Sequence, residues 1–193
     1  MRALRFALPA ALLLALGACL GGSKTPPTLL TLTSQAAPVA ISRSASAAET
    51  VTIEVPIAAK EIRQVRVAAL EGPGQVTYIK GLQYVDTPDK LFQNLLSETI
   101  KRTTRRIVLD PKQAGLDPGV KVTGTLERFG YDASTGQVTV VYDASMSTQG
   151  GTRVETRRFE ANVPTDGTAA SVGQAINGAA NAVANQAAAW IGG

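Results

Sequence analysis

Few side chains in this chain could do chemistry, and the single cysteine, Cys19, is the most distinctive of them. The sequence has no histidine, which removes the commonest general base, the usual zinc ligand and the standard serine triad. Its 15 aspartates and glutamates fall mostly in turns, at helix starts or on expected solvent faces. No nucleophile elbow, phosphate loop, calcium loop or metal-ligand spacing is present. The sequence therefore predicts a protein that is not an enzyme and needs neither a metal nor a cofactor.

Cys19 ends an N-terminal segment that is typical of a bacterial secretory signal. Two basic residues, Arg2 and Arg5, precede an apolar run over residues 6–16, which is too short to cross a bilayer as a helix. The run ends in an aliphatic residue, two small residues and the cysteine, which resemble a bacterial lipobox: Leu16, Gly17, Ala18 and Cys19. That resemblance implies a diacylglycerol on the Cys19 thiol, cleavage before Cys19 and acylation of the new amine. Residues 1–18 would then be a signal peptide; an ordinary signal peptide with a chance cysteine is the alternative.

Acylation of Cys19 would decide how firmly the protein is held at a membrane. A single acyl chain binds marginally, at about 0.8 kcal/mol per buried methylene, whereas two or three chains hold firmly. The next residue is Leu20, where an aspartate would resemble the signal for inner-membrane retention in Gram-negative bacteria. Its absence favours the periplasmic face of the outer membrane, and the inner membrane is the alternative.

Composition restricts the partners and the number of domains. Loss of residues 1–18 lowers the formal net charge from +4 to about +2, which is too little for nucleic-acid binding. Residues 19–27 contain Gly, Ser and Pro and are expected to form a lipidated tether. Residues 28–193 suit a single periplasmic α+β domain. Within it, residues 35–49 lack helical periodicity and are expected to form a flexible loop.

Several segments have the alternation or composition of strands: 28–33, 51–55, 62–70, 75–79, 106–109, 120–131, 137–148 and 153–163. Turn residues between 62–70 and 75–79 favour a hairpin, and the last three strands have the spacing of a meander. The first and third strands of that meander change phase partway. A β-bulge in each would explain the change.

Two segments have helical periodicity. The first, about 88–103, follows Thr87 as a possible N-cap and has Pro88 at its first position. The second, about 168–191, is rich in alanine and carries five Asn or Gln residues, mostly opposite its apolar stripe, which disfavours a membrane span. We expect this helix to pack closely on a sheet; packing on another subunit of a homo-oligomer is the alternative. Both helices are expected on one face of an antiparallel or mixed sheet, which gives an α+β fold.

Four basic residues gather at the C-terminal end of the first helix: Lys101, Arg102, Arg105 and Arg106. Favourable placement at the negative end of the helix dipole is one interpretation of this cluster. Contact with lipid phosphates or with an acidic partner is the other. The 35–49 loop and the asparagine stripe of the last helix are further exposed candidates for partner contacts.

The order of these landmarks resembles the ABC-type transport auxiliary lipoprotein family, the lipoprotein partners of MCE-domain phospholipid transport systems. The lipobox and tether are followed by the landmarks that carry the resemblance: residues 28–32, 75–78 and 84–88, the first helix, residues 120–129, residues 158–159 and the alanine-rich last helix. The chain departs from the family at Leu29 and Leu30, where an aromatic pair is usual, and at Tyr84, which stands near the place of a tryptophan.

The resemblance implies a non-catalytic periplasmic component that works with an MCE-domain protein, a permease and an ATPase to move phospholipids between membranes. It would dock the MCE assembly near the outer membrane. Two alternatives are a module that itself binds a phospholipid and an assembly lipoprotein of another outer-membrane complex. Few large apolar residues remain beyond those a core needs, which disfavours a roomy lipid pocket.

Overall fold

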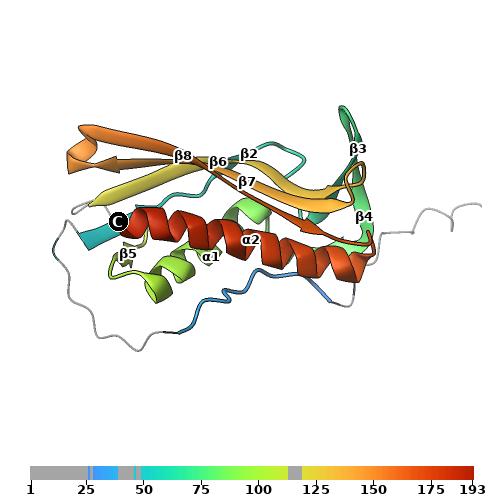
Figure 1. The fold of residues 1–193 in the computed structure, drawn as a ribbon, viewed down its shortest axis with the longest axis horizontal. Helices are drawn as coiled ribbons and strands as arrows, with labels where there is room; N and C mark the ends of the chain where they lie inside the picture. Colours follow the sequence, from blue (N-terminus) through green and yellow to red (C-terminus); the bar gives the residue numbers. More distant parts are fainter. Residues whose placement is uncertain (1–25, 27, 39–45, 47–48, 113–118) are drawn as a thin grey trace, which may run out of the picture.

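The computed structural model describes residues 26, 28–38, 46, 49–112 and 119–193. Within these residues an eight-stranded mixed sheet is covered on one face by two helices, α1 (Pro88–Thr103) and α2 (Ala169–Gly192) (Figure 1). This arrangement confirms the predicted α+β class and the predicted placement of both helices. The lipobox residues Leu16–Cys19 lie outside the described residues.

The C-terminal meander forms the largest part of the sheet. Its strands are β6 (Val120–Asp132), β7 (Gln137–Thr148) and β8 (Arg153–Pro164). They pair antiparallel in succession, which confirms the meander predicted from turn spacing.

The change of phase within the meander has two different causes. A register shift between Leu126 and Arg128 confirms the bulge predicted in β6. The bulge predicted in β8 is wrong, because β7 and β8 keep one register along their whole pairing. Val154 suggested that bulge; alternation places it on the opposite face from the buried Phe159, and it is 60% exposed.

Five further strands complete the sheet: β1 (Thr50–Ile53), β2 (Ile57–Ala58), β3 (Arg66–Gly72), β4 (Gln75–Gln83) and β5 (Ile107–Leu109). β1, β2 and β3 pair in parallel with successive parts of β6, in chain order along its other edge. β5 adds to β1 in parallel, and β4 pairs antiparallel with β3, which confirms the predicted hairpin. β6 is therefore the strand on which most of the sheet is assembled.

α1 begins where the sequence predicts. Thr87 has the extended backbone of an N-cap and Pro88 occupies the first turn, but the Thr87 hydroxyl makes no capping hydrogen bond. Instead the Thr87 N–H donates to the Asp86 carboxylate at 2.7 Å, which lowers the pKa of Asp86. The apolar face of the helix is buried: Leu91, Phe92, Leu95, Leu96 and Ile100.

α2 packs through small side chains. Its N-cap, Thr168, accepts a hydrogen bond from the Ser171 N–H, and its buried face is mostly alanine and glycine. Such a face lets the helix approach β7, β8 and α1 closely (Figure 1). In the described ranges, no helix combines the length and the hydropathy that crossing a bilayer requires.

An aromatic cluster occupies the core between α1 and the sheet. The fully buried Phe92 ring lies 5.0 Å from the Tyr142 ring and 6.4 Å from the Phe129 ring, centroid to centroid. Tyr84 extends the cluster, with its ring 6.1 Å from that of Phe129. Burial raises the pKa of the Tyr84 phenol. Phe92 belongs to α1, and the other rings belong to β6, to β7 and to the connection between β4 and α1. The cluster therefore joins α1 to the meander and to the end of β4.

Gly130 in β6 is required by the close approach of β3. A Cβ atom at this position would lie 2.5 Å from the backbone oxygen of Ala68. We expect Gly130→Ala to lower the free energy of unfolding by about 1–3 kcal/mol, measured by urea denaturation. The control is Gly72→Ala, where a Cβ would meet nothing within 4 Å. Equal stability of the two variants would contradict the close approach.

Candidate functional site: the N-terminal strap on the helix pair

The segment that follows the expected tether lies along the outer side of the two helices. We call residues 28–38 the strap; in Figure 1 it is the blue segment that runs beside α1 and α2. It enters next to the end of β4, where the Leu30 N–H donates to the Gln83 oxygen at 2.7 Å. The Val85 N–H donates to the Leu30 oxygen at 3.0 Å. The strap therefore begins as a short parallel addition to the sheet.

Two asparagines of α2 hold the middle of the strap. The Thr33 N–H donates to Asn177 Oδ1 at 3.0 Å. Asn181 accepts from the Gln35 N–H at 2.8 Å through Oδ1 and donates to the Thr33 oxygen at 2.9 Å through Nδ2. Asn181 thus offers the strap a donor and an acceptor, as a neighbouring β-strand would.

The spacing of the two asparagines matches the spacing of the strap. Two residues of extended chain advance about 6.6 Å, and four residues of α-helix advance about 6.0 Å. Thr33 and Gln35 are two residues apart, and Asn177 and Asn181 are four residues apart. Asn177 and Asn181, about one helical turn apart, therefore lie opposite Thr33 and Gln35, whose N–H groups face α2.

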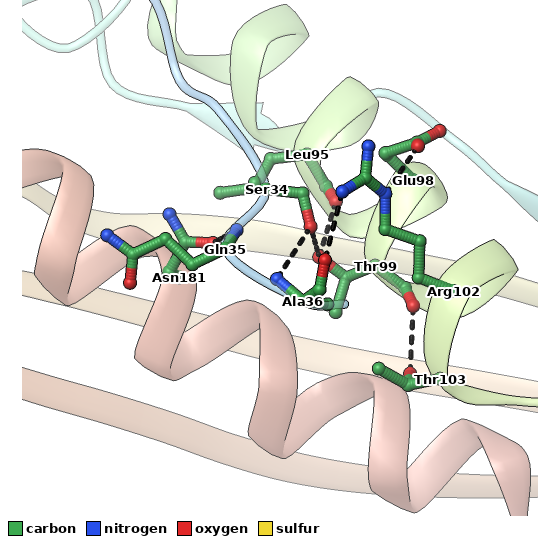
Figure 2. Close-up of polar contacts among 9 residues, drawn as sticks. All are labelled: Ser34, Gln35, Ala36, Leu95, Glu98, Thr99, Arg102, Thr103 and Asn181. Atoms are coloured by element: carbon green, nitrogen blue, oxygen red, sulfur yellow. Dashed lines mark hydrogen bonds and ion pairs between the residues drawn. The ribbon is translucent and has the colours of Figure 1, made fainter. Parts of the chain in front are cut away.

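α1 holds the strap from the other side (Figure 2). The Ser34 and Thr99 hydroxyls lie 3.3 Å apart, and since Thr99 donates its proton to the Leu95 oxygen, Ser34 is the donor between them. Arg102 Nη1 donates to the Ala36 oxygen at 2.9 Å. Arg102 is itself oriented by Glu98, whose Oε1 lies 2.7 Å from its Nε. The strap is thus bonded to both helices and links them.

The structure separates the four basic residues that the sequence groups. Arg102 holds the strap, and Arg106 Nε donates to the Ile191 oxygen in the last turn of α2. Lys101 and Arg105 are exposed near the same end of α1. Arg102 and Arg106 are therefore both committed to contacts within the domain.

The asparagine stripe of α2 is only partly the solvent face that the sequence predicts, since Gln174 and Asn185 are exposed whereas Asn181 is buried. Asn181 is only 2% exposed, because the strap covers it. Periodicity placed Asn177 and Asn181 opposite the apolar stripe, and it gave no sign that a distant segment would bind there. The start of the expected 35–49 loop, Gln35 and Ala36, belongs to the strap; residues 39–45 and 47–48 lie outside the described residues.

Hollows lie on both sides of the strap. One of about 460 Å³ separates it from the start of α2 and is lined by Leu30, Ala169 and Gly173, among others. Another of about 400 Å³ lies toward α1 and includes Asn94 and Lys101 in its lining. The strap is therefore held at its backbone while much of its length remains open to solvent.

A third hollow, of about 150 Å³, lies at β3 and β6 and includes Leu70, Arg128 and Asp132 in its lining. Its volume is below the roughly 300–1,000 Å³ of ordinary ligand pockets. The Ser134 hydroxyl and N–H donate to the Asp132 carboxylate and lower its pKa, with a smaller effect from Arg128. Asp132 is thus a structural carboxylate at a turn. Among the described residues no group of three His, Cys, Asp or Glu side chains is placed to hold a metal ion.

We expect Asn181→Ala to loosen the strap without unfolding the domain. The change removes two hydrogen bonds to the strap, each with a net value of about 0.5–1.5 kcal/mol. Hydrogen exchange at the Gln35 amide should accelerate about 5- to 150-fold, while amides of β7 keep their protection. Asn185→Ala, an exposed position one turn along, is the matched control. Unchanged exchange at Gln35 would contradict the role given to Asn181.

Comparison with known proteins agrees with this fold. A crystal structure of protein XCC0632 from Xanthomonas campestris has a TM-score of 0.71 at 17% identity, covering 84% of this chain and 94% of that one. A crystal structure of an uncharacterized protein has a TM-score of 0.59 at 15% identity, covering 75% and 90%. At these identities the likeness shows the fold alone. None of the curated proteins compared with the sequence matches it.

A protein-family model supplies the assignment that the fold alone does not. The model described as the ABC-type transport auxiliary lipoprotein component matches residues 30–188. The matched region begins at Leu30, where the strap joins the sheet, and ends within α2, so it includes the strap and both helices that hold it. The chain belongs to the family of ABC-type transport auxiliary lipoprotein components.

Proposed function

We propose that this protein is the non-catalytic, lipid-anchored component of an ABC-type system that moves phospholipids between membranes. Acylated Cys19 holds it at the periplasmic face of the outer membrane, and the domain docks the MCE-domain protein of the system. The observation that carries the proposal is the family match, which extends over residues 30–188 and so covers nearly all of the folded domain. The lipobox-like residues ahead of it supply the expected anchor.

The strap supports this function because it connects the anchor to the body of the domain. Any pull on Cys19 reaches the fold first at Leu30 and then at the hydrogen bonds made by Thr33, Gln35 and Ala36. These bonds go to the end of β4 and to both helices. A pull must therefore break contacts with several elements of the fold in turn before the strap is released.

The division of labour in such a system agrees with the chemistry of this chain. The ATPase supplies the energy for transport, and the MCE-domain protein carries the lipid. This component contributes position, because its acyl chains keep it in one membrane while its domain binds the assembly. Contact with the assembly is expected to rest on surface complementarity.

Deletion of the protein from a strain that lacks redundant transport systems tests the proposal. We expect phospholipid to accumulate in the outer leaflet of the outer membrane, and sensitivity to detergent to rise. Expression of the intact chain should restore both. Unchanged lipid asymmetry and unchanged permeability would count strongly against a role in phospholipid transport.

In-cell crosslinking identifies the partner. A photoreactive residue at the exposed Arg105 is expected to capture the MCE-domain protein. Capture of a secretin or a barrel protein would instead indicate an assembly lipoprotein of another complex. Native mass spectrometry of the delipidated protein tests the remaining alternative, a module that itself binds lipid. A co-purifying phospholipid would indicate such a module.

A further inference from the structure

Three exposed apolar residues lie on neighbouring backbone segments at the end of the domain where the strap begins. Leu29, Val65 and Val85 are 43%, 40% and 50% exposed. They lie on three backbone segments that are hydrogen-bonded side by side, since the Val85 N–H donates to the Leu30 oxygen and the Tyr84 N–H donates to the Val65 oxygen. We call Leu29, Val65 and Val85 the entry patch.

The entry patch is close in the chain to the expected anchor. Thr28 lies nine positions after Cys19, and even a fully extended chain of that length spans only about 30 Å. The start of the strap therefore stays within about 30 Å of the membrane that holds the acyl chains. The tether therefore limits the distance of the residues around Thr28 from the bilayer more tightly than that of any later part of the described chain.

The segments that carry the patch also carry an excess of positive charge. Residues 60–66 and 78–86 contain four basic residues and two acidic ones: Lys60, Arg63, Arg66, Lys80, Glu61 and Asp86. Asp86 is paired with Lys90, whose Nζ lies 3.2 Å from it. Arg66 stacks over the Tyr78 ring at 3.8 Å. Basic groups around apolar ones suit a surface of anionic head groups over acyl chains.

The basic cluster at the other end of α1 is less well placed for the same membrane. Arg106 bonds to Ile191 in the last turn of α2, whereas the strap begins beside Gly173 in its second turn. Gly173 and Ile191 are 18 residues apart in α2, so about 27 Å of helix separates the start of the strap from the cluster. The cluster therefore lies near the opposite end of the helix pair from the entry patch.

We propose that the entry patch rests on the bilayer that holds acylated Cys19, so that the domain has a fixed orientation on the membrane. Leu29, Val65 and Val85 contact the acyl boundary, and the neighbouring arginines and lysines face the head groups. The far end of the helix pair then points toward the assembly that the protein docks. This inference rests on the proposed anchor at Cys19.

Site-directed fluorescence on the full lipidated chain tests the orientation. Cys19 is the only native cysteine and its thiol is acylated in this proposal, so Val85→Cys provides the single labelling site. The matched control is Val154→Cys, a valine of β8 that is 60% exposed near the turn after β7. Each labelled protein is reconstituted into vesicles of phosphatidylethanolamine and phosphatidylglycerol that carry a nitroxide on a fraction of the head groups.

We expect the nitroxide to quench the label at position 85 several-fold more than the label at position 154. A label at Val65→Cys, used if Val85→Cys does not fold, should behave like the one at position 85. Equal quenching of the labels at positions 85 and 154, in protein that floats with the vesicles, would overturn the orientation and leave the anchor intact. Protein that fails to float and has an unmodified Cys19 by intact mass would overturn the anchor, and the orientation with it.

Discussion

Replacing Cys19 with alanine is expected to release the protein completely from the membrane fraction. Each acyl chain contributes about 0.8 kcal/mol per buried methylene, so one chain binds marginally and three bind almost irreversibly. The folded domain should keep its stability, because the described contacts of the strap begin at Leu30. Vesicle flotation of the exported variant measures the first effect, and thermal unfolding measures the second.

A variant of the tether separates loss of the anchor from a general effect of mutation near the cleavage site. Ser23→Ala leaves Leu16–Cys19 unchanged and is expected to float with membranes like the wild type. The Cys19→Ala protein should also fail to restore lipid asymmetry in a deletion strain, whereas Ser23→Ala restores it. Membrane association of the Cys19→Ala protein at high salt would show that something other than acyl chains holds the domain.

Replacing Phe92 with alanine is expected to have the largest effect on stability among simple substitutions in this domain. Phe92 is fully buried and contacts the aromatic rings of β6 and β7 through Phe129 and Tyr142. Truncation of a buried phenylalanine costs about 3–5 kcal/mol through lost transfer energy and the cavity left behind. That is a large part of the roughly 5–15 kcal/mol that stabilises an ordinary domain.

Urea denaturation followed by circular dichroism measures this loss. Asn94→Ala provides the control on the same helix, since Asn94 is exposed two residues along, and a change within about 0.5 kcal/mol is expected. The slope of the free energy against urea should stay the same for both variants, because the surface exposed on unfolding changes little. A loss below about 1 kcal/mol for Phe92→Ala would show that the aromatic cluster does not hold α1 on the sheet.

The elements encoded by local sequence patterns could be predicted from the sequence. α1 has a buried stripe at helical spacing and a Thr-Pro start, and the structure gives it the predicted bounds. The meander was equally accessible, because alternation and turn composition lie within a few residues of each other in the chain. Parallel pairing of β1, β2 and β3 with β6 was not, since it joins segments more than 60 residues apart.

The strap shows why the candidate site was less accessible than the fold. Thr33 and Gln35 bind to Asn177 and Asn181, which are more than 140 residues away. Polar residues opposite an apolar stripe ordinarily mark solvent, so periodicity alone assigned these two amides to the wrong environment. The feature of the sequence that relates to this contact is the four-residue spacing of Asn177 and Asn181. That spacing indicates a binding site only when an extended segment is known to lie beside the helix.

The basic residues of α1 show that a charge pattern in the sequence is equally insufficient to identify a contact. A cluster at a helix C-terminus is favourable through the dipole alone, and the sequence could not tell that from a binding surface. The structure gives Arg102 to the strap and Arg106 to the end of α2. Which partner the exposed Arg105 meets in the cell depends on the surface of another molecule, and crosslinking at this position identifies it.

Intact-mass analysis of the native protein extracted from membranes tests the anchor most directly. The proposal predicts a chain that begins at Cys19 and carries the added mass of a diacylglycerol and an amide-linked fatty acid. A chain of the same sequence without lipid, or one that still carries residues 1–18, would contradict the anchor on which the position and the docking role of this protein depend.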